Sequence, residues 1–276
     1  MKYKKFAIWS AGIAVVAIFG FVAVKSTLSP DSMPAAVTQV KGEVAPNHVF
    51  QTYKYPYKLR LKANSTKLFS APAGTRGAKY LGTVSDNKVT KDITATRRSD
   101  LNGSAKTGYI KFKDKAHTYW VSAQQVSFRD LNALAGNNAQ VETAIKAGLK
   151  LVGHSGYDYG GGRNIADVKH HKFDCSSFVR YCYRKAGITL GDLSSVTTYT
   201  LVEMGQPEKF KNLKRGDLFF FTNSKGQVNS HVAMYLGNNL FLHDHRQSDT
   251  GGVGISTLNA PSWRKETNGT VRRIAV

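Results

Sequence analysis

The chain has 276 residues, of which 41% are hydrophobic and 11% are aromatic. This composition excludes a largely disordered chain, since it supports a sizeable core, and the length favours one large or two modest domains. The formal net charge of +21 favours polyanionic partners, namely nucleic acid, anionic lipid headgroups or anionic cell-wall polymers.

Residues 1–25 have the pattern of a membrane-targeting segment. The basic stretch Met1–Lys5 precedes the uncharged run Phe6–Val24, which at about 19 residues is long enough to span ~30 Å of hydrocarbon. No small-residue cleavage site follows the run, so we favour an uncleaved signal anchor over a cleaved signal peptide. A buried core helix is the remaining alternative. We therefore expect the chain at the extracellular face of the cytoplasmic membrane or in the cell wall, or secreted if the helix is cleaved.

Export narrows the choice of partners and bears on the two cysteines. Outside the cell, nucleic acid is not an expected partner, whereas anionic wall polymers and lipid headgroups are. Cys175 and Cys182 are seven residues apart on one predicted helix, too far for a disulfide, whose Cα atoms must lie within ~7 Å. We interpret Cys182 as a core residue because apolar positions of the helix surround it.

Residues 26–47 are rich in Pro, Ser, Thr, Gly and Ala, which is typical of a flexible linker. Residues 48–130 contain short β-like runs separated by turn signals. The runs are Tyr57–Leu61, Lys67–Phe69, Tyr80–Val84, Tyr109–Phe112 and Tyr119–Val121. Several short strands in ~80 residues predict a small β-barrel. The ending Thr118–Ser122 resembles that of bacterial SH3-like wall-targeting domains, which implies a basic wall-binding module; a purely structural β-domain is the alternative.

Residues 138–276 are expected to form a second domain, of the α+β class. Asn138–Val152 has apolar residues at helical spacing, and Gly156–Gly162 is a glycine-rich loop that matches no phosphate-binding pattern. After a helix that begins at Cys175, apolar runs predict a series of strands. These runs are Leu213–Phe221, His231–Asn239, Leu240–His243, Val253–Ile255 and Val271–Val276. The pattern predicts a helix that carries a cysteine, followed by an antiparallel meander whose second strand begins with a histidine.

Cys175 lies at the predicted start of an amphipathic helix, with Asp174 and Ser176 beside it as cap candidates. Unpaired backbone N–H groups and the positive end of the helix dipole lower the pKa of a cysteine in that position. Cys175 is therefore a candidate nucleophile. Because most lone cysteines are small buried hydrophobes, the local sequence alone leaves both interpretations open.

Five motifs of the second domain resemble, in the same order, those of the NlpC-type cell-wall endopeptidases, which are papain-like cysteine peptidases of bacteria. The motifs lie in Tyr157–Gly161, Phe173–Val179, Leu213–Phe220, His231–Asn238 and Phe241–His243. The resemblance covers about residues 139–276 and does not extend to the first domain. It implies a papain-like fold in which N-terminal helices pack on an antiparallel sheet.

The resemblance also implies a role for individual residues. Cys175 matches the nucleophile of the family, His231 the general base, and His243 the polar residue that orients the base. Tyr157 matches a hydroxyl donor to the oxyanion. His245 faces the same way as His243 if the strand is regular, because side chains alternate along a strand, so His245 is the alternative orienting residue.

Two further positions match residues that contact the peptide substrate in the family, Asp174 and Ser176. Tyr159 stands where the family usually has Trp, which leaves the shape of the substrate pocket open. A zinc site built from the neighbours of Cys175, including His170 and His171, is not favoured, because adjacent ligands on a turn rarely close a tetrahedral shell. We expect no metal and no cofactor, and we interpret His154, His170 and His171 as surface residues.

These inferences combine into one functional hypothesis. The resemblance implies an exported peptidoglycan hydrolase that cleaves an amide of the stem peptide, the γ-D-glutamyl–diamino acid bond, by thiolate attack and acyl-enzyme formation. The expected partners are peptidoglycan stem peptides, anionic cell-wall polymers, and the membrane through the N-terminal helix. The alternatives are a non-enzymatic cell-wall-binding or scaffold protein, and a related amidase.

Overall fold

The computed structural model describes residues 46–275, and residues 1–45 and Val276 lie outside this range. The signal anchor or signal peptide predicted for residues 1–25 and nearly all of the linker predicted for residues 26–47 therefore fall outside the described residues. Over the described range, no helix combines the length and the apolar character that crossing a membrane requires.

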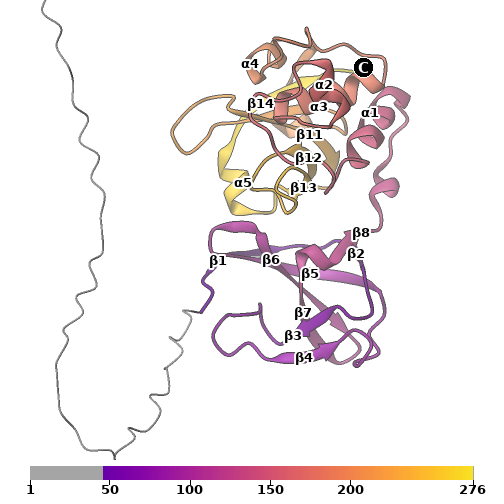
Figure 1. The fold of residues 1–276 in the computed structure, drawn as a ribbon, viewed down its shortest axis with the longest axis vertical. Coiled ribbons are helices and arrows are strands. Elements are labelled where there is room, and N and C mark those ends of the chain that lie inside the picture. The colour runs from indigo at the N-terminus through magenta and orange to yellow at the C-terminus, as the bar shows by residue number, and fades with distance from the viewer. Residues whose placement is uncertain (1–45, 276) are drawn as a thin grey trace, which may run out of the picture. The chain divides into compact units, whose positions relative to one another are not determined.

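An eight-stranded antiparallel sheet forms the first half of the described chain, in the order β4-β3-β7-β6-β5-β2-β8, with β1 paired to β5 (Figure 1). The strands are β1 (Val49–Lys54), β2 (Lys58–Leu61), β3 (Lys67–Phe69), β4 (Tyr80–Thr83), β5 (Asp92–Leu101), β6 (Ser104–Asp114), β7 (His117–Ser122) and β8 (Val126–Phe128). The sequence runs predict β2, β3, β4, β6 and β7, whereas β1, β5 and β8 are not predicted. Strand β5 contains four charged residues, and β8 is only three residues long.

The predicted small β-barrel is, in the structure, a sheet whose outermost strands β4 and β8 are not paired with each other. Burial alternates along the strands: Ile110 and Phe112 are buried in β6, for example, while Lys111 between them is partly exposed. One face of the sheet therefore forms a core, as is usual for antiparallel sheets. The resemblance to SH3-like wall-targeting domains stays a prediction.

The second half of the described chain contains a six-stranded antiparallel sheet in the order β13-β12-β11-β10-β14-β9. Its strands are β9 (Gln206–Lys209), β10 (Leu218–Phe221), β11 (His231–Gly237), β12 (Leu240–Asp244), β13 (Val253–Thr257) and β14 (Thr267–Arg273). The helices are α1 (Ala139–Leu149), α2 (Ile165–Lys169), α3 (Cys175–Lys185), α4 (Thr198–Leu201) and α5 (Pro261–Glu266). The predicted cysteine helix and the predicted meander correspond to α3 and β10–β13.

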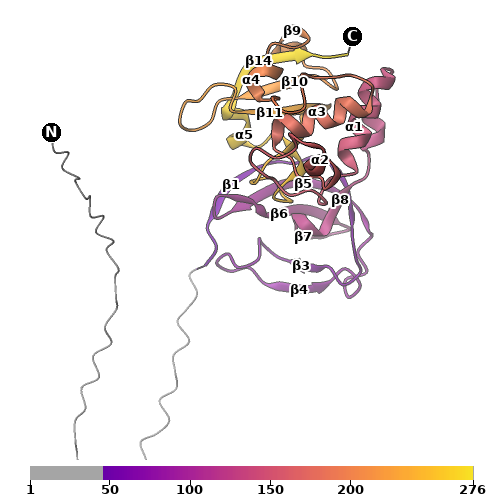
Figure 2. The same cartoon turned by 45° about the horizontal axis from the view of Figure 1, so that its top comes forward.

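Helices α1 and α3 pack against each other, and α3 packs on β11 and β12 (Figures 1 and 2). Gly148 of α1 permits a close approach, because a Cβ atom there would lie 2.7 Å from Leu242 and 2.9 Å from the sulfur of Cys182. Cys182 is fully buried, as expected for a core residue. The predicted packing of helices on an antiparallel sheet is thus present.

A tight turn between β11 and β12 sets the register of the two strands. Gly237, Asn238 and Asn239 all have positive φ, a conformation that glycine and asparagine adopt at low cost. Met234 then lies opposite Leu242. This register places His243 diagonally across from His231 on the same face of the sheet.

A buried ion-pair network joins the two sheets. The guanidinium of Arg98 in β5 donates to Asp100 of its own strand at 2.8 Å and to Asp249, which lies between β12 and β13, at 2.7 Å. The hydroxyl of Tyr57 also lies 2.7 Å from the hydroxyl of Thr257. Because a buried guanidinium is costly without its partners, this network holds the β1–β8 sheet against the β12–β13 connection.

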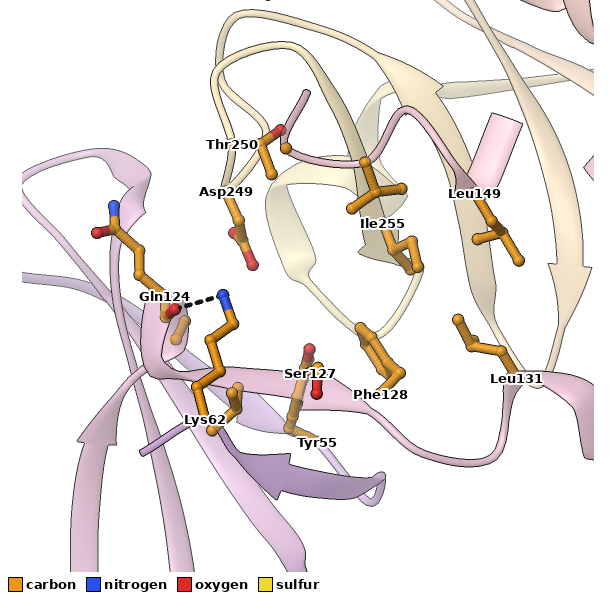
Figure 3. A pocket seen from close by; sticks show the side chains of 14 residues that line it. Tyr55, Lys62, Gln124, Ser127, Phe128, Leu131, Leu149, Asp249, Thr250 and Ile255 are labelled. Carbon is orange, nitrogen blue, oxygen red and sulfur yellow. Dashed lines mark hydrogen bonds between the residues drawn. The ribbon is translucent and has the colours of Figure 1, made fainter. Parts of the chain in front are cut away.

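A cavity of about 570 Å³ lies beside this junction. Figure 3 shows Phe128 and Leu131 from the first half facing Leu149 and Ile255 from the second. The ammonium of Lys62 donates to the carbonyl oxygen of Gln124 at one end. The cavity therefore has an apolar floor and a polar rim.

Candidate active site

Helix α3 begins at Cys175 because Asp174 caps it. One carboxylate oxygen of Asp174 accepts the backbone N–H groups of Ser176 at 3.1 Å and Ser177 at 3.0 Å, and the Ser177 hydroxyl accepts the backbone N–H of Asp174 in return. This reciprocal capping box satisfies N–H groups that a helix start leaves without partners. The predicted helix start at Cys175 is confirmed.

A line of three polar side chains runs inward from the cysteine. His231 is the first residue of β11, and its Nε2 lies 3.0 Å from Nδ1 of His243 in β12. Nε2 of His243 lies 3.0 Å from the hydroxyl oxygen of Ser256 in β13. His231 is buried and His243 is fully buried, so three neighbouring strands hold this relay in a dry setting.

The relay determines which tautomer of His231 can act as a base. If Nε2–H of His231 donates to His243, then His243 donates its own Nε2–H to Ser256, and Nδ1 of His231 keeps a free lone pair. The reverse polarity would place the proton on Nδ1 of His231. Only the first arrangement leaves His231 ready to accept a thiol proton, and in that arrangement the Ser256 hydroxyl accepts from His243.

Cys175 and His231 line one cavity of about 480 Å³. The backbone N–H of Val232, the residue after His231, acts on the sulfur of Cys175, which places the thiol at the start of β11. The other lining residues come from the glycine loop, the start of α3, α4, the β10–β11 connection, the segment after β12, and α5. They are Tyr157, Tyr159, Gly160, Arg163, Asp174, Ser176, Thr197, Thr198, Tyr199, Phe221, Asn223, Gln227, Ser230, His245, Trp263 and Glu266. The structure thus brings five of the six predicted site residues to one cavity wall, with His243 directly behind His231.

Tyr157 is held on the wall of this cavity by its backbone and its ring. Its N–H donates to the carbonyl of Gly251 at 3.2 Å, and the guanidinium of Arg246 lies over the ring at 5.4 Å from the centroid. Burial and the neighbouring Cys175 raise the pKa of Tyr157. Its hydroxyl therefore stays protonated and available as a donor.

Asp174 and Ser176 are engaged by Arg163, a residue that the motif comparison of the sequence missed. The guanidinium donates to Asp174 at 2.7 Å and to the hydroxyl of Ser176 at 3.3 Å. Gly162 lets the glycine loop come this close, because a Cβ there would lie 2.5 Å from the hydroxyl of Ser177. Arg163 brings a positive charge to the cavity rim.

Burial controls the protonation of the reacting pair. It raises the pKa of Cys175 to about 12, with Asp174 adding to the rise, and lowers the pKa of His231 well below its usual range. The expectation that the helix start lowers the pKa of Cys175 is therefore wrong for the resting site. The nearby N–H groups of Val232 and Ser176 act in the expected direction, but desolvation outweighs them.

Two more titratable residues surround the relay. His245 accepts the backbone N–H of Gln247 through Nδ1, its ring lies 4.8 Å from that of His231, and burial lowers its pKa to about 4. Asp244 is fully buried, and neither carboxyl oxygen has a hydrogen-bond partner among the described residues. Burial, with Asp174 next in size, raises the pKa of Asp244 to about 8.

The remaining predicted positions lie outside the cavity. His154 and His170 are exposed, and His171 packs its ring near those of Phe173 and Tyr181. Among residues 46–275, no group of three or more His, Cys, Asp or Glu side chains is arranged to hold a metal ion.

The sequence did not identify Ser256, Arg163 or Trp263. Trp263 of α5 packs against His231 and His243 with ring centroids at 6.0 and 5.0 Å. No short motif marks these residues, because each reaches the site through strand register or loop closure. Chemically, a thiol beside an oriented imidazole, with a hydroxyl and a helix-start N–H nearby, suits nucleophilic attack on an acyl carbon.

Comparison with known proteins gives one family and several relatives. Residues 154–272 match the NlpC/P60 family. The chain is 43% identical over 143 residues to the peptidoglycan DL-endopeptidase CwlO of Bacillus licheniformis, a match that covers 52% of this chain and 30% of that protein. The helices packed on an antiparallel sheet agree with the papain-like fold expected of this family.

Two other relatives carry different activities in their names. The murein DD-endopeptidase MepS/murein LD-carboxypeptidase of Escherichia coli K12 is 40% identical over 96 residues, covering 34% of this chain and 46% of that protein. The gamma-D-glutamyl-L-lysine dipeptidyl-peptidase of Bacillus cereus is 34% identical over 101 residues, covering 36% of this chain and 28% of that protein. The chain spans between about a quarter and a half of the length of these curated relatives.

Proposed function

Residues 154–272 of this chain are an NlpC/P60 domain, and from this premise we propose that the protein is a cysteine endopeptidase that hydrolyses an amide bond in peptidoglycan stem peptides. The observation that carries the proposal is the relay from His231 through His243 to Ser256, directly behind the cavity that Cys175 lines. The names of two relatives refer to peptidoglycan or murein, and the name of the third refers to a gamma-D-glutamyl-L-lysine peptide.

The reaction begins from the neutral thiol and imidazole. Nδ1 of His231 takes the proton of Cys175 as the sulfur attacks the amide carbonyl, and the positive imidazole and negative sulfur stabilise each other in the dry cavity. His243 accepts Nε2–H of His231 and fixes the ring in this orientation. The thiol proton then moves from His231 to the leaving amine as the C–N bond breaks.

The intermediate left behind is a thioester on Cys175. Water, deprotonated by His231, attacks it and releases the carboxyl product, and the proton returns to the sulfur. Two donors support the oxyanion in both steps: the backbone N–H of Cys175 at the start of α3 and the hydroxyl of Tyr157. The raised pKa of Tyr157 supports this role, since a phenol that stays protonated remains a donor.

The bond that we propose as the target is the γ-D-glutamyl–diamino acid amide. The names of two relatives favour it, one a DL-endopeptidase and one a gamma-D-glutamyl-L-lysine peptidase. Arg163 supports it chemically, because D-glutamate joined through its side chain keeps a free α-carboxylate, which a guanidinium binds well. Ser176 lies beside Arg163 and offers a hydroxyl, while Asp174 fixes both.

We also propose that the chain works outside the cytoplasmic membrane. The apolar run Phe6–Val24 supports a membrane anchor or export signal, and the net charge of +21 supports contact with anionic wall polymers. On this proposal the β1–β8 sheet is a wall-binding module.

Muropeptide digestion by the full chain tests the proposal. We expect wild type to release products cut at the γ-D-glutamyl bond and Cys175→Ala to lose at least about 10³-fold in rate. The matched control is Cys182→Ala, which removes the other thiol and should keep the activity. Equal digestion by wild type and Cys175→Ala would refute a cysteine peptidase, and products cut only at other bonds would refute the bond assignment alone.

A further inference from the structure

The outer face of the β1–β8 sheet carries a row of paired residues that crosses six strands. The cross-strand partners run Lys54 with Arg97, Arg97 with Lys111, Lys111 with Trp120, Trp120 with Phe69, and Phe69 with Tyr80. Directly paired residues of antiparallel strands project from the same face. We call these six residues the basic–aromatic row.

Burial confirms that the row points away from the core of the sheet. Leu68, Ile110, Tyr119 and Val121, which adjoin row residues in sequence, are 5% exposed or less. Within the row, Lys54, Arg97 and Tyr80 are exposed, Phe69 and Lys111 are partly exposed, and Trp120 is buried at 9% exposure. The row is therefore a surface feature formed by strand register.

One end of the row is basic and the other is aromatic. The ammonium of Lys111 lies over the ring of Trp120, 5.9 Å from its centroid, and joins the two ends. The ring of Phe69 packs against the rings of Tyr80 and Tyr109, with centroid distances of 5.9 and 6.1 Å. Tyr80 remains 55% exposed.

The dimensions of the row suit an elongated ligand. Neighbouring strands are spaced by about 4.8 Å, so a row over six strands extends to at most about 24 Å. A small molecule would occupy only part of it, whereas a polymer that crosses the strands would meet cations at one end and aromatic rings at the other. Aromatic faces pack on the apolar faces of sugar rings, and Lys and Arg pair with carboxylates.

We propose that the basic–aromatic row binds the glycan strand of peptidoglycan, with the aromatic end packing on sugar rings and the basic end pairing with carboxylates of the attached peptides. This inference rests on the proposed function, since it takes the polymer that carries the cleaved peptides as the ligand. To the proposed function it adds the site at which the protein binds the glycan strand and the side chains that make the contacts. Arg98, next in sequence to Arg97, ties β5 to the β12–β13 connection, so polymer bound to the row would lie on the same compact unit that carries Cys175.

The test is cosedimentation of the full chain with insoluble peptidoglycan stripped of other wall polymers, using the inactive Cys175→Ala background. We expect Tyr80→Ala, and separately the pair Arg97→Ala with Lys111→Ala, to weaken binding about fivefold or more. The matched charge control is the pair Lys146→Ala with Lys150→Ala on the surface of α1. This control should leave binding unchanged, and Tyr80→Phe should retain it.

Three results would overturn the proposal: equal weakening by the α1 control pair, unchanged binding by Tyr80→Ala, or binding that needs phosphate-bearing polymers or nucleic acid in place of stripped peptidoglycan. Cleavage of a soluble stem peptide by the row variants, in the Cys175 background, separates the two hypotheses. Unchanged peptide cleavage with weakened polymer binding supports the row. If wild type does not cleave the peptide, the proposed function is refuted. The cosedimentation result then still shows whether the basic–aromatic row binds peptidoglycan.

Discussion

The two antiparallel sheets of this chain bury their side chains in different ways. In the β9–β14 sheet, every residue of β10, β12 and β13 is buried, because helices cover one face and further chain covers the other. In the β1–β8 sheet, buried and exposed residues alternate along β2 and β6, so one face is a core and the other is a surface.

This difference determines where each sheet can carry polar chemistry. A polar group inside the β9–β14 sheet is costly unless it finds a partner in the protein, and His231, His243 and Ser256 find theirs in each other. On the β1–β8 sheet, the outer face can present cations and aromatic rings to a ligand without that cost. Reaction chemistry therefore sits in the doubly covered sheet, and the proposed polymer contact sits on the one-sided sheet.

The largest effect is expected from a substitution that breaks the relay from His231 through His243 to Ser256. His243→Ala removes the acceptor for Nε2–H of His231, and we expect kcat on a soluble stem peptide to fall by about 10²–10⁴ while polymer binding stays unchanged. His154→Ala, at an exposed position, is the matched control. His245→Ala addresses the alternative orienting residue; a larger loss there than at His243 would contradict the relay.

The next largest effect is on the free energy of unfolding, and it compares Arg97 and Arg98, which are neighbours on opposite faces of β5. Arg98→Met leaves Asp100 and Asp249 without their buried cation, and we expect the free energy of unfolding to fall by about 3–5 kcal/mol. Arg97→Met, one residue earlier on the outer face, should change it by less than about 0.5 kcal/mol and weaken polymer binding instead. Chemical denaturation measures both, and equal destabilisation by the two would show that the faces do not differ.

Asp244 tests how the covered sheet tolerates an unpaired carboxyl. The pKa of Asp244 in the folded protein, about 8, lies above the pKa of the same carboxyl in the unfolded chain. Between about pH 4 and pH 8 the folded state therefore keeps a proton that the unfolded state has lost. The free energy of unfolding falls as pH rises through that window. Asp244→Asn removes this dependence. Between pH 6 and pH 8, we expect the variant to gain about 2 kcal/mol relative to wild type; parallel stability curves would exclude the raised pKa.

The smallest expected effect is at the far end of the relay. Ser256→Ala removes the hydroxyl that accepts Nε2–H of His243 in the productive tautomer, and we expect kcat to fall by about tenfold or less, as for one neutral hydrogen bond. KM should stay constant, because Ser256 does not line the cavity. A rise in KM without a change in kcat would argue against a role in orienting the base.

A local pattern in the sequence predicted the start of α3, and the family resemblance supplied the other candidate site residues. The start of α3 follows from Asp174 and the polar residues after it, which act within one helical turn, and His231 and His243 stand in motifs tied to strand starts and ends. Ser256 and Arg163 escaped prediction because their partners lie 13 and 11 residues away and meet them only after the strands and the glycine loop are in place.

In the β1–β8 sheet too, contacts between residues far apart in the sequence escaped prediction. Strand β5 carries Arg97 and Arg98 in succession, a pattern that argues against a buried strand. The contacts of Arg98 with Asp100 and with the distant Asp249 explain why its guanidinium is inside. The protonation state of Cys175 was also beyond the sequence, because desolvation by the assembled cavity outweighs the helix start.

The ion pair between Arg98 and Asp249 has a mechanical consequence. Asp249 belongs to the segment that leaves β12 after His243 and His245 and returns as β13 with Ser256, so this segment is attached to both sheets. A pulling force applied to β5 would therefore pass through two charge-assisted hydrogen bonds to the segment that joins the strands of His243 and Ser256.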